Sequence, residues 1–163
     1  MSLPDDIHLN SSLRLERISS EHVRDFMEIY LDKENVQYMD DVIKSWNGDE
    51  QKAQSTIREI NASEKDFVYF VYVDDQVVGL LGFENISSEN EAEIWYILKK
   101  QEQGKGIMAN VLSEFLKLNQ EKHYFAKIFA EIKKENTKSA DLVKKLGFRY
   151  ISSSDIKSRF CYP

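Results

Sequence analysis

One stretch, from Glu91 to Glu121, constrains the fold more than any other because its residue pattern changes twice along its length. It begins as an apolar run rich in β-branched and aromatic residues, which is typical of a strand inside a sheet. It ends as a segment whose apolar side chains recur at helical spacing, at Ile107, Val111, Phe115 and Leu118. A glycine-containing loop joins the two. The stretch therefore predicts a central strand, a loop and a helix with one buried side.

The loop is notable because the helix begins on glycines, Gly104 and Gly106, and not on a Ser or Asp cap. The first turn of a helix leaves N–H groups without partners and carries the positive end of the helix dipole. Glycines there would let a phosphate reach the bare main chain. An ordinary tight turn from strand to helix explains the same residues equally well. The loop matches neither the P-loop nor the dinucleotide-binding fingerprint.

This loop resembles the coenzyme A pyrophosphate loop of the GNAT superfamily of N-acetyltransferases, whose signature is Gln/Arg-x-x-Gly-x-Gly/Ala shortly after a strand. The register from Gln101 to Gly106 fits the letters better. The register Gln103-x-x-Gly106-x-Met108 fits the geometry better and is adopted, with Met108 in place of the usual small residue. The run Gly-Lys-Gly-Ile-Met resembles the branch that acetylates the N termini of ribosomal proteins.

Three downstream segments resemble the second half of the same superfamily in order and spacing. They are Ala130-Glu131-Ile132, Glu135-Asn136-Thr137-Lys138-Ser139 and Lys145-Leu146-Gly147-Phe148. The resemblance implies an α/β (α+β) fold with a mixed, mainly antiparallel sheet flanked by helices and a splayed central strand pair. We expect residues 1–163 to form one such domain, since this length suits a single core.

The resemblance also implies that acetyl-CoA, as co-substrate, lies in the opening between the splayed strands. Backbone groups of Tyr96, Ile97 and Leu98 would then hold the pantetheine arm and polarise the thioester carbonyl. The pyrophosphate would be held by the loop residues Gln103, Gly104, Lys105, Gly106, Ile107 and Met108, with Lys105 adding charge. As side chains, the three strand residues are explained equally well as core.

Acetyl transfer to an amine requires removal of a proton from the ammonium group, and carboxylates near the opening are candidates for the base. Glu93 lies on the central strand, on the same face as Trp95 by alternation. Glu131 is an acidic residue within an apolar segment, which is costly unless it is paired or used. Either residue is also compatible with a solvated strand face. Glu93 is the preferred base because its own strand would hold the thioester.

Asn136 and Ser139 match a coenzyme-contacting Asn and a residue near the thiolate in the family resemblance. A helix cap and a solvent-facing serine are the alternative interpretations. Val143 occupies the position at which much of the family carries a tyrosine that protonates the thiolate. The resemblance therefore leaves the general acid unassigned.

The remaining pattern predicts further elements on both sides of this stretch. We expect strands at Leu13–Ile18, Phe67–Val73, Gln76–Phe83, Lys127–Lys133, Phe148–Ser152 and Lys157–Tyr162, and helices at Glu21–Leu31, Asp49–Ile60 and Thr137–Leu146. Ser19 or Ser20 would cap the first helix, Asp74-Asp75 would form a hairpin turn, and Gly79 and Gly82 would mark a bulge or a close contact. We expect Met1–Asn10 to be loosely ordered and Asp32–Gly48 to be packed but irregular.

Composition excludes several classes of function. A formal charge of −6 argues against a general nucleic-acid binder. No apolar run is long enough to span a membrane and no secretion signal is visible, so we expect a cytoplasmic protein. Cys161 is the only cysteine, which rules out an intramolecular disulfide. Three dispersed histidines predict no metal site.

The family resemblance implies an acetyl-CoA-dependent N-acetyltransferase that acts by direct attack in a ternary complex. The acceptor would be a primary amine, and Asp40, Asp41 and Glu93 favour a cationic one, such as a protein N terminus or a polyamine. The alternatives are a small-molecule amine acetyltransferase of polyamine or aminoglycoside type and a catalytically silent acyl-CoA-binding module. We expect a monomer or homodimer.

Overall fold

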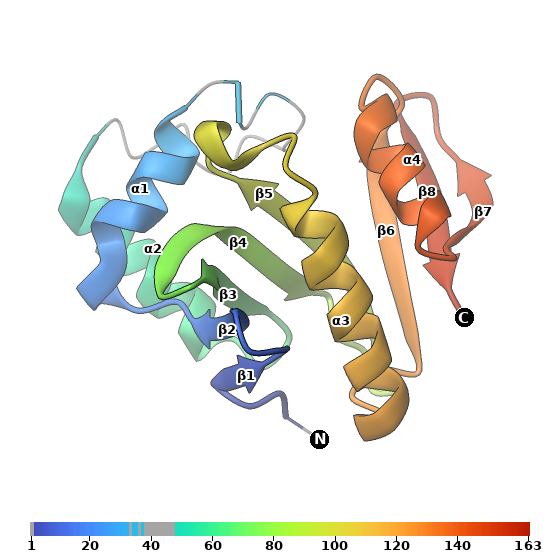
Figure 1. The fold of residues 1–163 in the computed structure, drawn as a ribbon, viewed down its shortest axis with the longest axis horizontal. Coiled ribbons are helices and arrows are strands. Elements are labelled where there is room, and N and C mark those ends of the chain that lie inside the picture. Colours follow the sequence, from blue (N-terminus) through green and yellow to red (C-terminus); the bar gives the residue numbers. More distant parts are fainter. Residues whose placement is uncertain (1, 33, 36, 38–47) are drawn as a thin grey trace.

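The computed structural model describes residues 2–32, 34–35, 37 and 48–163. Within them the chain forms one eight-stranded sheet and four α-helices (Figure 1). The strands are β1 (Asp6–His8), β2 (Leu13–Arg17), β3 (Phe67–Val73), β4 (Gln76–Glu84), β5 (Glu91–Leu98), β6 (Lys127–Lys133), β7 (Arg149–Ser153) and β8 (Lys157–Tyr162). The helices are α1 (Val23–Leu31), α2 (Glu50–Ala62), α3 (Ile107–Lys122) and α4 (Thr137–Lys145).

The strands lie in the order β1-β2-β3-β4-β5-β6-β8-β7. Of the strand pairs in the described chain, β5 and β6 are parallel and the others are antiparallel. Helix α3 supplies the crossover that allows this parallel pair. The predicted hairpin between β3 and β4 turns through Asp74 and Asp75, whose φ angles of 46° and 67° suit a primed turn. The predicted mixed, mainly antiparallel sheet is confirmed.

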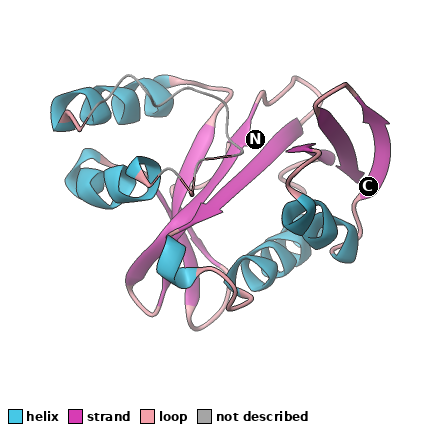
Figure 2. Cartoon of the chain, turned by 90° about the horizontal axis from the view of Figure 1, so that it is seen from above, coloured by secondary structure: helices cyan, strands magenta, loops and turns pink. Residues whose placement is uncertain are grey.

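The helices cover both faces of the sheet, two on each side (Figure 2). Side chains of α1 and α2, such as Phe26 and Ile57, pack against Phe70 and Leu80 of the central strands. On the opposite face α3 packs against alternate residues of the central strands, where its Phe115 contacts Phe83 of β4, and α4 packs against β6. Because strand residues alternate between faces, each central strand is buried on both sides.

Gly79 and Gly82 mark a close approach between β4 and β5, as the sequence predicts. A Cβ atom at Gly79 would lie 2.3 Å from the carbonyl oxygen of Ile97. A Cβ atom at Gly82 would lie 2.1 Å from the indole of Trp95. The sheet register also shifts on the partner strand between Val71 and Tyr72, beside Gly79. Gly82 therefore makes the space into which the Trp95 ring packs, and Gly79 lets β4 approach the backbone of β5.

The N-terminal segment is better ordered than the sequence predicts. Asp6–His8 forms β1 and pairs with β2, while the side chains of Leu3 and Ile7 are only 6% and 3% exposed. The expectation that residues 1–10 are loosely ordered is therefore wrong for this strand. A three-residue strand is too short to show a period, so alternation did not reveal it.

The predicted serine cap is also wrong. Neither Ser19 nor His22, the residues that precede the first short 3-10 turn and α1, makes a side-chain cap hydrogen bond. Helix α2 does carry a side-chain cap, because Asp49 accepts hydrogen bonds from the N–H groups of Gln51 and Lys52.

Most of the predicted irregular stretch, including Asp40 and Asp41, lies outside the described residues. No helix in the part of the chain that the structure describes is long and apolar enough to cross a membrane.

Candidate functional site

The central feature of the site is a seam between β5 and β6, which we define as residues 94–98 of β5 and 130–133 of β6. The two strands pair only at Glu91, Ala92 and Glu93, and they then diverge (Figure 1). Beyond Glu93, β5 pairs with β4 alone and β6 pairs with β8 alone. The seam is the splayed strand pair predicted from the sequence, and it presents free strand edges inside the sheet.

The loop that follows β5 ends in a glycine that caps α3. Gly106 has φ 76° and makes no side-chain cap bond, and Gly104 has φ 77°. A Cβ atom at either position would meet no atom within 4 Å. Residues 103–106 are all exposed. The first turn of α3 thus has no side-chain cap and has open space beside it, which is compatible with the predicted phosphate site.

Side chains brace this loop against the end of β5. The Gln103 amide donates hydrogen bonds to the Leu98 carbonyl at 3.1 Å and to the Asn35 side chain at 2.9 Å. The Leu98 carbonyl is predicted to contact the pantetheine arm, and it already accepts this hydrogen bond from Gln103. Lys105 forms an ion pair with Glu102 at 3.2 Å, which offsets part of the charge it was predicted to supply.

The last predicted loop residues lie inside the first turn of α3. Ile107 is half-buried and Met108 is buried, so only their main-chain N–H groups can face a ligand.

Just before the loop, Lys99 contacts Asp25 at 3.0 Å and Glu28 at 3.1 Å. Burial lowers the pKa of Lys99, but its bonds to these two carboxylates outweigh that effect and raise it. This ion pair ties the end of β5 to α1.

The two candidate bases lie on one face of the sheet where the seam begins, and they share an arginine. Arg159 of β8 lies opposite Glu131 in the ladder, and its Nη1 contacts Glu131 at 2.8 Å and Glu93 at 3.1 Å. The second oxygen of Glu93 accepts a hydrogen bond from Asn85 at 3.4 Å. The structure therefore brings Glu93 and Glu131 together, with Arg159 between them.

This cluster of Glu93, Glu131 and Arg159 is partly shielded from solvent. The three side chains are 24%, 37% and 28% exposed, and the guanidinium lies 4.2 Å from the centre of the Phe129 ring. Burial lowers the pKa of Arg159, but its hydrogen bonds to both carboxylates prevail and raise it. Two negative groups against one positive group leave a net negative charge, which attracts a cation. An incoming ammonium group must compete with Arg159 for the carboxylates.

Two hydroxyl groups meet on the opposite face of the seam. The Tyr96 hydroxyl lies 2.6 Å from the Ser139 hydroxyl, and Ser139 belongs to the first turn of α4. Asn136 is the N-cap of α4 and accepts a hydrogen bond from the Ser139 N–H at 3.3 Å. The interpretation of Ser139 as a solvent-facing serine is therefore wrong, whereas Asn136 does cap a helix. Val143 has 0% exposure and packs in the core.

With this geometry in place, comparison with known proteins decides the family. The model of the acetyltransferase (GNAT) domain matches residues 12–149. The chain belongs to this family. No curated protein sequence is significantly similar to this GNAT chain.

Solved GNAT structures share the fold over nearly the whole chain. A RimL ribosomal L7/L12 alpha-N-protein acetyltransferase in complex with coenzyme A has a TM-score of 0.84 at 14% identity, over 96% of this chain and 97% of that one. A microcin C7 self-immunity acetyltransferase, MccE, with acetyl-CoA and AMP has a TM-score of 0.83 at 19% identity, over 98% and 97%. A spermidine N-acetyltransferase from Vibrio cholerae with CoA and spermine has a TM-score of 0.80 at 17% identity, over 94% and 96%.

Sequence reasoning missed four features of this GNAT site. They are the contacts of Arg159 and Asn85 with Glu93, the bond from Gln103 to Asn35, and the hydroxyl bond of Tyr96. Arg159 carried a usable signal, because a cationic residue in a predicted terminal strand is suited to pair with an acidic residue of a neighbouring strand. The other three depend on how separate elements pack.

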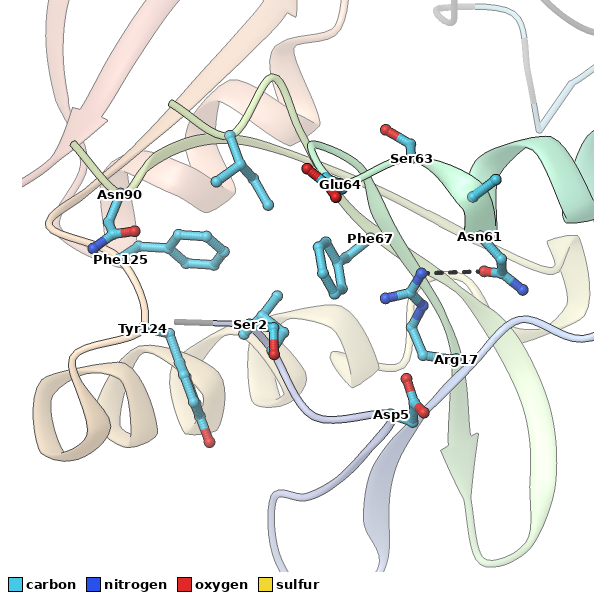
Figure 3. Close-up of a pocket in the computed structure, with 13 residues that line it drawn as sticks. Ser2, Asp5, Arg17, Asn61, Ser63, Glu64, Phe67, Asn90, Tyr124 and Phe125 are labelled. Atoms are coloured by element: carbon cyan, nitrogen blue, oxygen red, sulfur yellow. Dashed lines mark hydrogen bonds between the residues drawn. The ribbon is translucent and has the colours of Figure 1, made fainter. Parts of the chain in front are cut away.

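A cavity of about 550 Å³ lies away from all these residues (Figure 3). Its lining includes Phe125, which follows the C-terminal end of α3, and Phe67, whose ring contacts the Arg17 guanidinium at 4.1 Å. Helix α3 has 16 residues and is roughly 24 Å long, and the glycine loop is at its other end. None of the predicted site residues lines this cavity. It is therefore separate from the GNAT site.

Proposed function

We propose that the protein is an acetyl-CoA-dependent N-acetyltransferase that transfers acetyl to a primary amine by direct attack in a ternary complex. The observation that carries the proposal is the seam. It has a glycine loop suited to a phosphate at one end, carboxylates on one face and hydroxyl groups on the other. The solved neighbours in complex with coenzyme A or acetyl-CoA support this choice of co-substrate.

Each part of the seam has a role in the proposal. The N–H groups at the start of α3 bind the pyrophosphate. The backbone of Tyr96, on the edge of β5 that has no partner in β6, holds the pantetheine arm and polarises the thioester carbonyl, whereas the Ile97 carbonyl lies against Gly79 of β4. Asn136 lies beside the same arm at the start of α4. Glu93 removes the proton from the acceptor ammonium, with Glu131 as the rival base. Since Arg159 and Asn85 bind both oxygens of Glu93, the acceptor displaces one of them.

The acceptor is a cationic amine, because the cluster around Arg159 is net negative. Neighbours with this fold bear the names of a ribosomal-protein alpha-N-acetyltransferase and a spermidine N-acetyltransferase. A protein N terminus is our first candidate, since the loop resembles the ribosomal-protein branch, and a small polyamine is the second. The lone Cys161 suits the reducing cytoplasm that we expect for such an enzyme.

A turnover assay tests the proposal. Release of the coenzyme A thiol from acetyl-CoA is followed with peptides bearing a free N terminus, with polyamines and with aminoglycosides. The same peptides with a blocked N terminus and no lysine are the matched controls. We expect turnover only with free amines. Saturable acetyl-CoA binding without turnover on any amine would favour a silent acyl-CoA-binding module, and turnover confined to hydroxyl acceptors would refute the amine assignment.

A further inference from the structure

One hydrogen bond connects β5 to α4 on the face of the seam covered by α3 and α4. It joins Tyr96, in the part of β5 that has no partner in β6, to Ser139, which is 43 residues later in the sequence. Apolar side chains surround it, because Tyr96 and Ala140 both pack against the larger core cluster. Two hydroxyl groups thus lie together in an otherwise apolar wall at the opening of the seam.

We infer that Tyr96 is a positioning residue that orients the Ser139 hydroxyl so that Ser139 donates a hydrogen bond to the sulfur of coenzyme A. The inference rests on the proposed function and extends it to the leaving group. The family resemblance matches Ser139 to a residue near the thiolate, and the position of the family's usual tyrosine is occupied by the buried Val143. The structure adds the bond between Tyr96 and Ser139, which the resemblance does not imply.

The number of hydrogens in the pair supports this role. Two hydroxyl groups hold two hydrogens, and the bond between them uses only one. Burial raises the pKa of Tyr96, an effect that its bond to Ser139 only partly offsets, so the phenol keeps its proton at neutral pH. When Tyr96 donates to Ser139, the hydrogen of Ser139 remains for a third group. Donation in series also strengthens each bond.

The groups for the acceptor amine and the group for the leaving sulfur lie on opposite faces of the seam. The carboxylates Glu93 and Glu131 lie on one face and the hydroxyl pair on the other, because residues 93 and 96 of β5 point in opposite directions. An amine that reaches the seam from the carboxylate face meets the thioester between the strands, and the sulfur leaves toward α4.

The step balances without a charged serine. The amine nitrogen forms its bond to the carbonyl carbon, the carbon–sulfur bond breaks, and its electron pair goes to sulfur. The surplus proton on nitrogen leaves through Glu93 or water, and sulfur takes a proton from water. Ser139 stabilises the sulfur anion through a hydrogen bond and keeps its own proton, which matters because an alcohol is a poor acid.

A binding experiment isolates this role from turnover. Calorimetry measures the affinity for coenzyme A and for desulfo-coenzyme A, which lacks the thiol, between pH 6.5 and 9.5. In the unmodified protein the affinity ratio of the two ligands should rise with pH as the thiolate forms. A bond to a charged group is worth about tenfold or more in affinity, so Ser139→Ala should lose about that factor at the highest pH. Tyr96→Phe should lose a smaller part of it.

Tyr69→Phe is the matched control, because the Tyr69 hydroxyl is also a hydrogen-bond donor, to the carbonyl of Pro4 at 2.8 Å, far from the seam. It should leave the affinity ratio unchanged. A ratio in Tyr96→Phe equal to that of the unmodified protein would show that the bond only satisfies a buried hydroxyl. An equal fall in Tyr69→Phe would also overturn the inference. Failure of the unmodified protein to bind either ligand would instead remove the proposed function itself.

Discussion

Replacement of Gly106 by valine tests the loop most directly, because the structure separates its effect on the fold from its effect on the ligand. A Cβ atom at Gly106 would meet no atom within 4 Å, so a small side chain there has open space in the free protein. It would project into the space that we propose for the pyrophosphate. Gly48 offers a matched control, since it also has a positive φ, 80°, and open space around its Cβ position, but lies outside the loop.

The magnitudes make the two effects distinguishable. A left-handed conformation costs a side-chain-bearing residue roughly 1–2 kcal/mol, so both Gly106→Val and Gly48→Val should lower the free energy of unfolding by about that amount. A ligand at a hundredfold excess over its dissociation constant stabilises the folded state by about 2.7 kcal/mol. For a chain of this length, that corresponds to a rise in Tm of about 5–10 °C.

Thermal unfolding with and without acetyl-CoA measures both quantities. We expect the unmodified protein and Gly48→Val to show the rise in Tm, and Gly106→Val to show almost none while it still unfolds cooperatively. An undiminished rise in Gly106→Val would refute the assignment of this loop to the pyrophosphate. Loss of the rise in Gly48→Val as well would show that strain and not obstruction is responsible.

Three further predictions follow from other parts of the structure. Glu93→Gln should lower turnover at neutral pH by about 10²- to 10⁴-fold, with recovery as pH rises and little change in acetyl-CoA affinity; if Glu131→Gln alone behaves so, the roles are reversed. Gly82→Ala should destabilise the fold by about 1–3 kcal/mol because its methyl group meets the Trp95 ring, and a Trp95→Ala background should remove most of that cost in urea unfolding. Burial raises the pKa values of Tyr30, Tyr69 and Tyr96 from 10.0, so above pH 10 the unfolded chain loses protons that the native state keeps, and the free energy of unfolding should fall. Phenolate absorbance that shows full ionisation before unfolding would contradict the last prediction.

The parts of the fold that could be predicted are those whose signal is local. The spacing of apolar residues identified β5 and α3, and β6 is observed as predicted, from Lys127 to Lys133. The glycines before Ile107 were recognisable because few residues other than glycine tolerate the observed φ of 76° without strain. The splayed strand pair was predicted from the family resemblance alone, because no local sequence pattern indicates where two strands stop pairing.

The parts that escaped prediction depend on contacts between distant segments. The position of Arg159 between two carboxylates requires the register of β6 against β8 and the end of pairing at Glu93. The bond between Tyr96 and Ser139 depends on where α4 lies over the seam. The prediction that Glu93 and Glu131 flank one opening was thus accessible, whereas their shared partner was not.

The seam also bears on the solubility of the chain. An unpaired strand edge is normally a template for pairing with another molecule, which leads to aggregation. Here the edge of β5 at residues 94–98, which has no partner in β6, lies inside the sheet between β5 and β6. A strand from a second molecule would have to thread between two halves of one sheet. The outer boundaries are formed instead by the short strands β1 and β7, of three and five residues. The strand edge that is most available for pairing is thus placed inside the sheet, and the two edges at its ends are short.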